Sequence, residues 1–203
     1  QSENYYRTIF ETSGTVMLIS EEDTTILHVN SLFEELLGYS KQEVQGKKLW
    51  TEFVHPGDMQ WMIESHYLRR RNPNAAPRRY ECRLITRQGQ ERHVLLAIDM
   101  IPGTQRSIAS GTDITVRKTA EQALRESEER YRKLINTSPD AIALVDEDGR
   151  FLTVNPAMAK RFGLTPEELT GKTYHQVMPK ELAEKRIMDA ERSLNDEEFI
   201  YFE

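Results

Sequence analysis

Apolar and polar residues alternate with the two-residue period of a β-strand in three segments of the chain. These segments are 80–86, 91–100 and 107–113. In the first of them Tyr80, Cys82 and Leu84 fall on one face. Glu81 and Arg83 fall on the other face. The pattern predicts three strands, each with one face turned to an apolar core.

The chain also contains an internal repeat. Residues 6–47 align without a gap to residues 131–172, and the matched positions lie 125 residues apart. Matched pairs include Tyr6 and Tyr131, Asn30 and Asn155, Gly38 and Gly163, and Glu43 and Glu168. A repeat with this spacing predicts two consecutive domains.

Each copy carries the same local signals in the same order. A short apolar strand, an acidic turn and a second strand predict a hairpin at its start. The turns are 21–23 and 146–149. Asn30 and Asn155 follow the second strand, where a side-chain oxygen can cap the next helix. Capping boxes at 40–43 and 165–168 predict a further short helix in each copy.

In the first copy a longer helix is expected after the His-Pro-Gly-Asp segment at 55–58. Trp61, Ser65 and Leu68 share one face of this helix. A turn-rich loop at 72–77 then leads to the three alternating segments. The resulting order of elements is ββααααβββ.

Taken together, these features resemble the PAS family. The likeness is carried by YRTIFETSG and YRKLINTSPDAI, by HVNSLFEELLGYSKQEVQGK and TVNPAMAKRFGLTPEELTGK, by FVHPGD and by GTDIT. It implies an α+β fold with two PAS-type domains, each a five-stranded antiparallel sheet with helices on one face. In outline the chain is similar to tandem sensor domains upstream of bacterial or archaeal histidine kinases.

The resemblance places a first domain with an N-terminal helix at 1–115, a helical linker at 116–136 and a second domain at 137–203. The second copy ends at Glu203, within its expected third strand, EEFIYFE. We therefore expect this domain to lack its last two strands and to expose a sheet edge. Because the chain begins at Gln1 without an initiator Met, we expect it to be a fragment of a longer protein.

The connecting segment favours one continuous helix, because it has no Gly or Pro between positions 114 and 138. A seam with coiled-coil spacing runs along it. The seam residues are Ala120, Leu124, Ser127, Tyr131 and Leu134. Two interpretations fit this seam: a parallel homodimer through helices, and an amphipathic helix packed on its own domain.

Asp113 and Thr115 stand between the last strand and this helix, where the resemblance places the output of the first domain. Either side chain can cap the helix, and Arg117 and Lys118 are nearby basic partners for Asp113. We expect this junction to couple the sheet to the helix. A plain N-cap without a signalling role is the alternative.

In a PAS domain a ligand lies between the inner face of the sheet and the helices, which gives eight candidate residues. They are Trp50, Phe53, Trp61, Met62, Cys82, Leu84, Leu96 and Ile98. A filled core is the alternative interpretation.

The resemblance also raises two cofactors. His66 lies on the helix that supplies the iron ligand in haem-binding PAS domains, so haem is the sharpest cofactor hypothesis. Tyr67 and the arginines that follow indicate, however, that the face beside His66 meets solvent. Photoreactive flavin chemistry is excluded, because its cysteine motif is missing between positions 49 and 55. The cofactor is otherwise unknown, and none is required.

Composition narrows the class of function further. A net charge of −6 and the lack of interleaved aromatic residues argue against nucleic-acid binding by the arginines at 69–71, 78 and 79, which we expect on a solvated loop. Cys82 is the single cysteine and is expected to be a small buried residue, with redox sensing as the alternative. The histidines show no metal-ligand spacing, and no catalytic triad, phosphate loop or kinase signature is present.

The longest apolar runs are far shorter than the roughly 20 residues of a membrane span, so we expect a cytoplasmic fragment without membrane contact. A membrane anchor elsewhere in the parent protein stays open. The sequence thus predicts a non-catalytic sensory input module that senses a small molecule or partner and transmits the signal through the linker helix. By analogy, the parent protein is expected to be a histidine kinase. A dimerisation scaffold without ligand is one alternative, and the input domain of a cyclic-dinucleotide synthase or transcription regulator is another.

Overall fold

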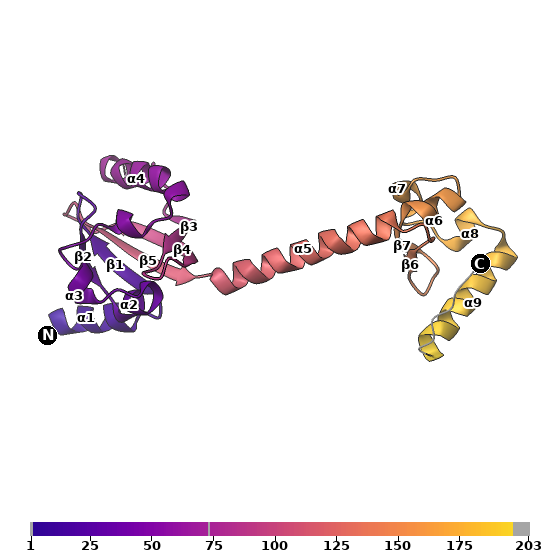
Figure 1. The fold of residues 1–203 in the computed structure, drawn as a ribbon, viewed down its shortest axis with the longest axis horizontal. Helices are drawn as coiled ribbons and strands as arrows, with labels where there is room; N and C mark the ends of the chain where they lie inside the picture. The colour runs from indigo at the N-terminus through magenta and orange to yellow at the C-terminus, as the bar shows by residue number, and fades with distance from the viewer. Residues whose placement is uncertain (1, 73, 197–203) are drawn as a thin grey trace. The chain divides into compact units, whose positions relative to one another are not determined.

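The protein is described by a computed structural model that covers residues 2–72 and 74–196. The chain divides into two compact units, Gln1–Gln122 and Ala123–Glu203 (Figure 1). The expected third strand of the second copy, EEFIYFE, lies outside the described residues.

The N-terminal unit is built on a five-stranded antiparallel sheet. Its strands are β1 (Val16–Ser20), β2 (Ile26–Val29), β3 (Arg79–Ile85), β4 (Glu91–Met100) and β5 (Ser107–Asp113). They lie in the order β2-β1-β5-β4-β3, so the last strand pairs with the first at the centre of the sheet. The three alternating segments of the sequence match β3, β4 and β5 to within one residue, which confirms the predicted sheet.

Five helical segments complete this unit (Figure 1). They are α1 (Ser2–Thr12), α2 (Ser31–Leu37), α3 (Lys41–Val44), the 3₁₀ helix η1 (Trp50–Phe53) and α4 (Pro56–Arg71). The core forms where side chains from α2, α3, η1 and α4 meet the sheet. Its buried members include Phe33, Leu37, Val44, Phe53, Met62, Val94 and Leu96. The apolar face predicted for the strands is therefore the face that packs against the helices.

The predicted helix caps are confirmed. Asn30 Oδ1 accepts a hydrogen bond from the Phe33 amide at 3.2 Å, at the start of α2. At the start of α3 the Ser40 hydroxyl and the Glu43 carboxylate bond each other's backbone amides, as a capping box requires. The second copy repeats both caps, with Asn155 at the first position and Thr165 at the second.

The face of α4 that carries Trp61, Ser65 and Leu68 is not the face that is buried. Leu68 is 42% exposed, whereas the buried residues of this helix are Met62, His66 and Arg69. Their spacing of four and three residues also places them on one helical face. The face turned to the core thus carries a histidine and an arginine beside Met62.

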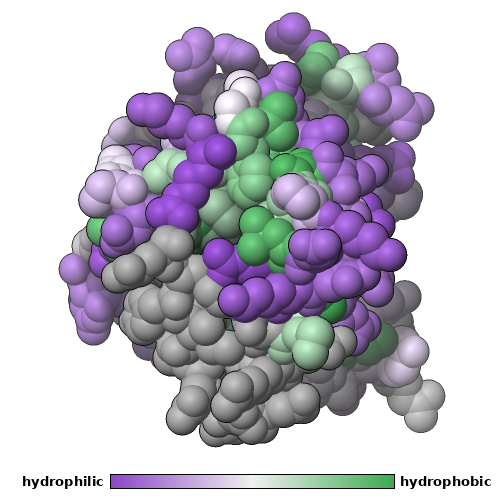
Figure 2. All heavy atoms as spheres, turned by 90° about the vertical axis from the view of Figure 1, so that its right-hand side faces the viewer, coloured by the Kyte–Doolittle hydropathy of each residue, from purple (hydrophilic) through white to green (hydrophobic). Residues whose placement is uncertain are grey.

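The C-terminal unit contains a two-stranded sheet and four helices among its described residues. The elements are β6 (Ala143–Val145), β7 (Phe151–Val154), α6 (Pro156–Arg161), α7 (Pro166–Leu169), α8 (Tyr174–Val177) and α9 (Lys180–Asp196). Phe151, Val154, Ala159 and Leu169 form its core. Apolar side chains also gather on its surface (Figure 2), and the large exposed ones include Leu144, Leu152 and Leu182.

A helix of 23 residues, α5 (Thr115–Thr137), starts in the N-terminal unit and ends in the C-terminal unit. Its interior carries no Gly or Pro, as the sequence indicated. None of its side chains is buried. Over residues 2–72 and 74–196, no helix combines the length and the apolar character that crossing a membrane requires.

Candidate ligand pocket

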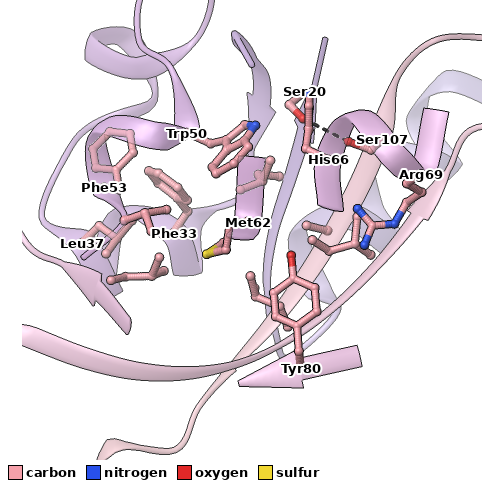
Figure 3. A pocket seen from close by; sticks show the side chains of 16 residues that line it. Ser20, Phe33, Leu37, Trp50, Phe53, Met62, His66, Arg69, Tyr80 and Ser107 are labelled. Carbon is pink, nitrogen blue, oxygen red and sulfur yellow. Dashed lines mark hydrogen bonds between the residues drawn. The ribbon is translucent and has the colours of Figure 1, made fainter. Parts of the chain in front are cut away.

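A cavity of about 60 Å³ lies inside the N-terminal unit (Figure 3). It is enclosed by α2, η1 and α4 on one side and by strands of the sheet on the other. Its lining residues are Leu18, Ser20, Phe33, Leu37, Trp50, Phe53, Val54, Met62, His66, Arg69, Tyr80, Leu84, Leu96, Ile98, Ser107 and Ala109. The cavity thus lies between the sheet and the helices, where the family resemblance predicts a ligand.

Six of the eight residues named from the sequence line this cavity, and two do not. Trp61 instead packs edge-on against the Tyr80 ring, with centroids 4.8 Å apart. Cys82 is buried elsewhere in the core, and burial raises the pKa of its thiol to about 12. Cys82 therefore stays a protonated, apolar core residue at neutral pH.

The cavity has a polar end that sequence analysis missed. Figure 3 shows Ser20, Ser107, Arg69 and Tyr80 on one side and Phe33, Leu37 and Phe53 on the other. The Ser20 and Ser107 hydroxyls, from β1 and β5, are hydrogen bonded at 3.1 Å. Burial raises the pKa of Tyr80 to about 12, so its phenol stays protonated and can donate a hydrogen bond.

His66 is buried, so the expectation that its face meets solvent is wrong. Its ring packs against the Trp50 ring, with centroids 5.3 Å apart. Its Nε2 lies 3.0 Å from the carbonyl oxygen of Glu22, and because a carbonyl can only accept, Nε2 carries the proton and donates it. Burial lowers the pKa of His66 to about 4, which keeps the ring neutral at pH 7.

Haem does not fit this site. The Nε2 atom of His66 is engaged with Glu22 and is not free to bind iron. A drug-sized ligand needs a pocket of roughly 300–1,000 Å³, and the porphyrin is larger than such ligands. The cavity of about 60 Å³ beside His66 is well below this range.

Four arginines of the predicted solvated loop are not on a loop, since Arg79 begins β3 and the first three belong to α4. Arg69, Arg70 and Arg71 form the last turn of α4, and Arg69 is only 2% exposed. Arg69 Nη2 donates to the carbonyl oxygen of Pro77 at 2.7 Å. Arg70 donates to the carbonyl oxygens of His66 and Glu21, each at 3.0 Å. These two side chains therefore hold the end of α4 in place, and the prediction of a solvated position for them is wrong.

The start of α4 is fixed to β3 by an ion pair. Asp58 Oδ1 accepts from Arg83 Nη2 at 2.7 Å. Asp58 Oδ2 accepts from Arg83 Nε at 3.0 Å and from the Arg83 backbone amide at 2.8 Å. The hydrogen bond from the Arg83 side chain holds the pKa of Asp58 below its usual range. The His-Pro-Gly-Asp segment thus sets the position of the helix that supplies Met62, His66 and Arg69 to the cavity.

The junction between β5 and α5 is also held by specific contacts. Asp113 Oδ1 accepts from the Thr115 amide at 2.8 Å, and Thr115 Oγ1 accepts from the His93 amide of β4 at 2.9 Å. The basic partner of Asp113 is Arg92, at 3.9 Å. Arg117 and Lys118, its expected partners, both pair with Glu81 of β3 instead. The first turn of α5 is therefore attached to β3 and β4 of its own unit.

Comparison with known families agrees with this architecture. A model of the PAS fold matches residues 4–101 and 129–200, which together make up most of the chain. The chain belongs to the PAS family. The two matched segments correspond to the two copies of the internal repeat, and the five-stranded antiparallel sheet with its helices is the PAS fold.

The alignments with individual relatives span only part of this chain, and the alignment with BvgS also spans only a small part of that protein. The virulence sensor protein BvgS of Bordetella pertussis is 42% identical over 60 residues, which span 30% of this chain and 5% of BvgS. A PAS domain from Colwellia psychrerythraea has a TM-score of 0.50 and 18% identity, covering 57% of this chain and 98% of that one. A sensory box sensor histidine kinase/response regulator domain from Geobacter sulfurreducens has a TM-score of 0.47 and 23% identity, covering 55% and 94%. At 18% identity the Colwellia psychrerythraea structure supports the fold alone.

Proposed function

We propose that this PAS chain is a non-catalytic sensory input module and that the cavity of its N-terminal unit receives a small molecule. The observation that carries the proposal is the cavity itself, which is apolar over most of its wall and has a cluster of polar groups at one end. Binding pockets combine these two properties, since apolar surface supplies affinity and a few polar groups fix orientation. The parent protein is proposed to be a histidine kinase, because the duplicated motif order resembles its input region and because BvgS is a sensor protein.

Signal transmission is proposed to run from β3 to α5. Tyr80 lines the cavity, and the next residue, Glu81, points to the opposite face of the sheet, where it pairs with Arg117 and Lys118. A ligand that displaces β3 at Tyr80 therefore also displaces the partner of the first turn of α5. Asp113 and Thr115, which hold the same turn, are the proposed coupling residues.

The proposed assembly is a homodimer through α5. Leu124, Tyr131 and Leu134 are 62%, 66% and 65% exposed, and their spacing is that of a coiled-coil seam. A second copy of the chain offers the same seam and would cover these side chains. Sedimentation velocity tests this: Leu124→Glu is expected to give a monomer, and Gln122→Glu, with the same charge change off the seam, to remain a dimer. A wild-type monomer at all concentrations would refute the dimer.

The sensing function is tested by filling the cavity. Ala109 is buried and lines it, so Ala109→Leu is expected to occupy the ligand space. Ala97, exposed on the neighbouring strand β4, takes the same substitution as a control. Native mass spectrometry of the whole chain is expected to show bound small-molecule mass in the wild type and Ala97→Leu, and none in Ala109→Leu. Equal bound mass in both variants would place the ligand elsewhere, and no bound mass from any source would favour the scaffold without ligand.

A further inference from the structure

The cavity contains a buried positive charge without a negative partner. Arg69 is 2% exposed, and its guanidinium group carries a positive charge. Its Nε is buried and has no hydrogen-bond partner among the described residues. Its Nη2 donates to the Pro77 carbonyl, which is neutral. Over residues 2–72 and 74–196, no carboxylate lies within the 4.0 Å of an ion pair to Arg69.

Two acidic residues of the turn between β1 and β2 have other partners. Glu21 pairs with Arg106 at 2.9 Å, and Asp23 accepts from the Thr25 amide at 2.9 Å in an exposed turn. His66 brings no negative charge, because it is neutral. A buried charge is costly unless it is paired and hydrogen bonded. Arg69 is therefore a buried cation whose missing partner would be an anion.

The geometry around Arg69 is that of a site for one end of a small molecule. Arg69 and the Tyr80 phenol lie at the same end of the cavity (Figure 3), and both are hydrogen-bond donors. The opposite end is formed by Phe33, Leu37 and Phe53, which have no polar side-chain atom. A molecule complementary to this cavity has one anionic group and one apolar part. A planar carboxylate matches the guanidinium fork in shape as well as in charge.

The volume limits the size of the molecule. A dry protein cavity of about 150 Å³ binds benzene, with its six heavy atoms. The cavity of about 60 Å³ is smaller, so a molecule that fits it has fewer heavy atoms than benzene. Long-chain acids exceed this space.

We propose that the cavity binds a small monocarboxylate with fewer heavy atoms than benzene, with its carboxylate on the Arg69 guanidinium and its short apolar chain toward Met62. The carboxylate accepts from the unpartnered Nε–H and from a guanidinium N–H that Pro77 does not use. The inference rests on the proposed sensing function and names the chemical class of its ligand.

The test uses the whole chain and sodium propionate as the probe. Thermal unfolding and isothermal titration calorimetry are followed at constant ionic strength, with sodium chloride as the reference salt. Propionate is expected to raise the unfolding temperature and to bind at one site per chain. Propionamide, which has the same shape without the charge, is expected to bind at least tenfold more weakly.

Two variants separate a specific site from a general anion effect. Arg69→Met keeps the length of the side chain and removes the charge, so propionate binding is expected to fall at least tenfold. Arg79→Met, at an exposed arginine of β3, is expected to bind propionate as the wild type does.

The outcomes distinguish this inference from the function on which it rests. Equal stabilisation by propionate, chloride and propionamide, or unchanged propionate binding by Arg69→Met, would overturn the carboxylate site. If propionate fails while a neutral molecule of similar size binds and Ala109→Leu abolishes that binding, the sensing function stands and the carboxylate does not. If neither propionate nor a neutral molecule of similar size binds, both fail.

Discussion

Asn30 offers the most direct test of how the N-terminal unit is held together. It is fully buried, and its amide makes four short hydrogen bonds to the backbone of three different segments. Oδ1 accepts from the amides of Met17 at 2.9 Å and Phe33 at 3.2 Å. Nδ2 donates to the carbonyl oxygens of Thr15 at 2.7 Å and Phe10 at 3.2 Å. One side chain thus joins the end of α1, the start of β1 and the start of α2.

Asn30→Ala removes these bonds. Loss of the helix cap costs about 1 kcal/mol. The amide of Met17 and the carbonyl oxygen of Thr15 each lose their bond to this side chain in a buried setting, at about 1 kcal/mol apiece. The cap is the bond to the Phe33 amide, which is therefore counted once. The expected loss in the free energy of unfolding is about 3 kcal/mol.

The chain supplies its own assay and control. Its two tryptophans, Trp50 and Trp61, both lie in the N-terminal unit, so tryptophan fluorescence during urea unfolding reports on that unit. Asn155→Ala makes the equivalent change in the second unit, where the amide bonds Ile142, Met158, Ile135 and Asp140. Asn30→Ala is expected to shift the fluorescence transition by about 3 kcal/mol, and Asn155→Ala to leave it in place. A shift below about 1 kcal/mol for Asn30→Ala, or equal shifts for both, would refute the reasoning.

Three further predictions follow from other contacts. The Arg83 side chain lowers the pKa of Asp58. The stability from this pair is therefore present above the unfolded pKa of about 4 and is lost as the pH falls through the lower folded pKa. The urea midpoint of Asp58→Asn should depend less on pH below about 4 than the wild-type midpoint does. A Cβ on Gly111 would lie 2.8 Å from Val94 Cγ1, so Gly111→Ala should destabilise the sheet by about 1–3 kcal/mol, as measured by the same fluorescence transition. Cys82, with its pKa raised to about 12, should react with a thiol reagent only after denaturant unfolds the chain, and fast reaction in the native state would contradict its burial.

Short-range signals predicted the framework of this structure well. Turns, N-caps and capping boxes depend on residues within four positions of one another, so the sequence alone specifies them. The alternation of Tyr80, Cys82 and Leu84 likewise located β3 to within one residue. Duplication strengthened each prediction, because two copies of one signal had to agree.

The polar end of the cavity could not be predicted in the same way. Arg69 stands first in a run of three arginines, and such runs usually lie in solvent. Arg69 is buried because the chain folds back on α4 after the helix ends. Its side chain donates to the carbonyl oxygen of Pro77 in the following loop and lines the same cavity as Tyr80 of β3. Met62, His66 and Arg69 do have the four- and three-residue spacing of one helical face. Only one of the three is apolar, however, so hydrophobic periodicity does not identify that face as buried.

The same alternation that defines β3 also connects the cavity with the rest of the unit. Tyr80 faces the cavity, Glu81 faces the first turn of α5, and Arg83 holds the start of α4 through Asp58. A one-residue slip of β3 would exchange these roles, and seven residue pairs with β4 fix its register against such a slip. On the proposed function, β3 is therefore the element on which a ligand acts. A displacement of Tyr80 reaches Glu81 through one peptide unit, so Glu81→Gln should uncouple α5 from ligand binding and leave the affinity of the cavity unchanged.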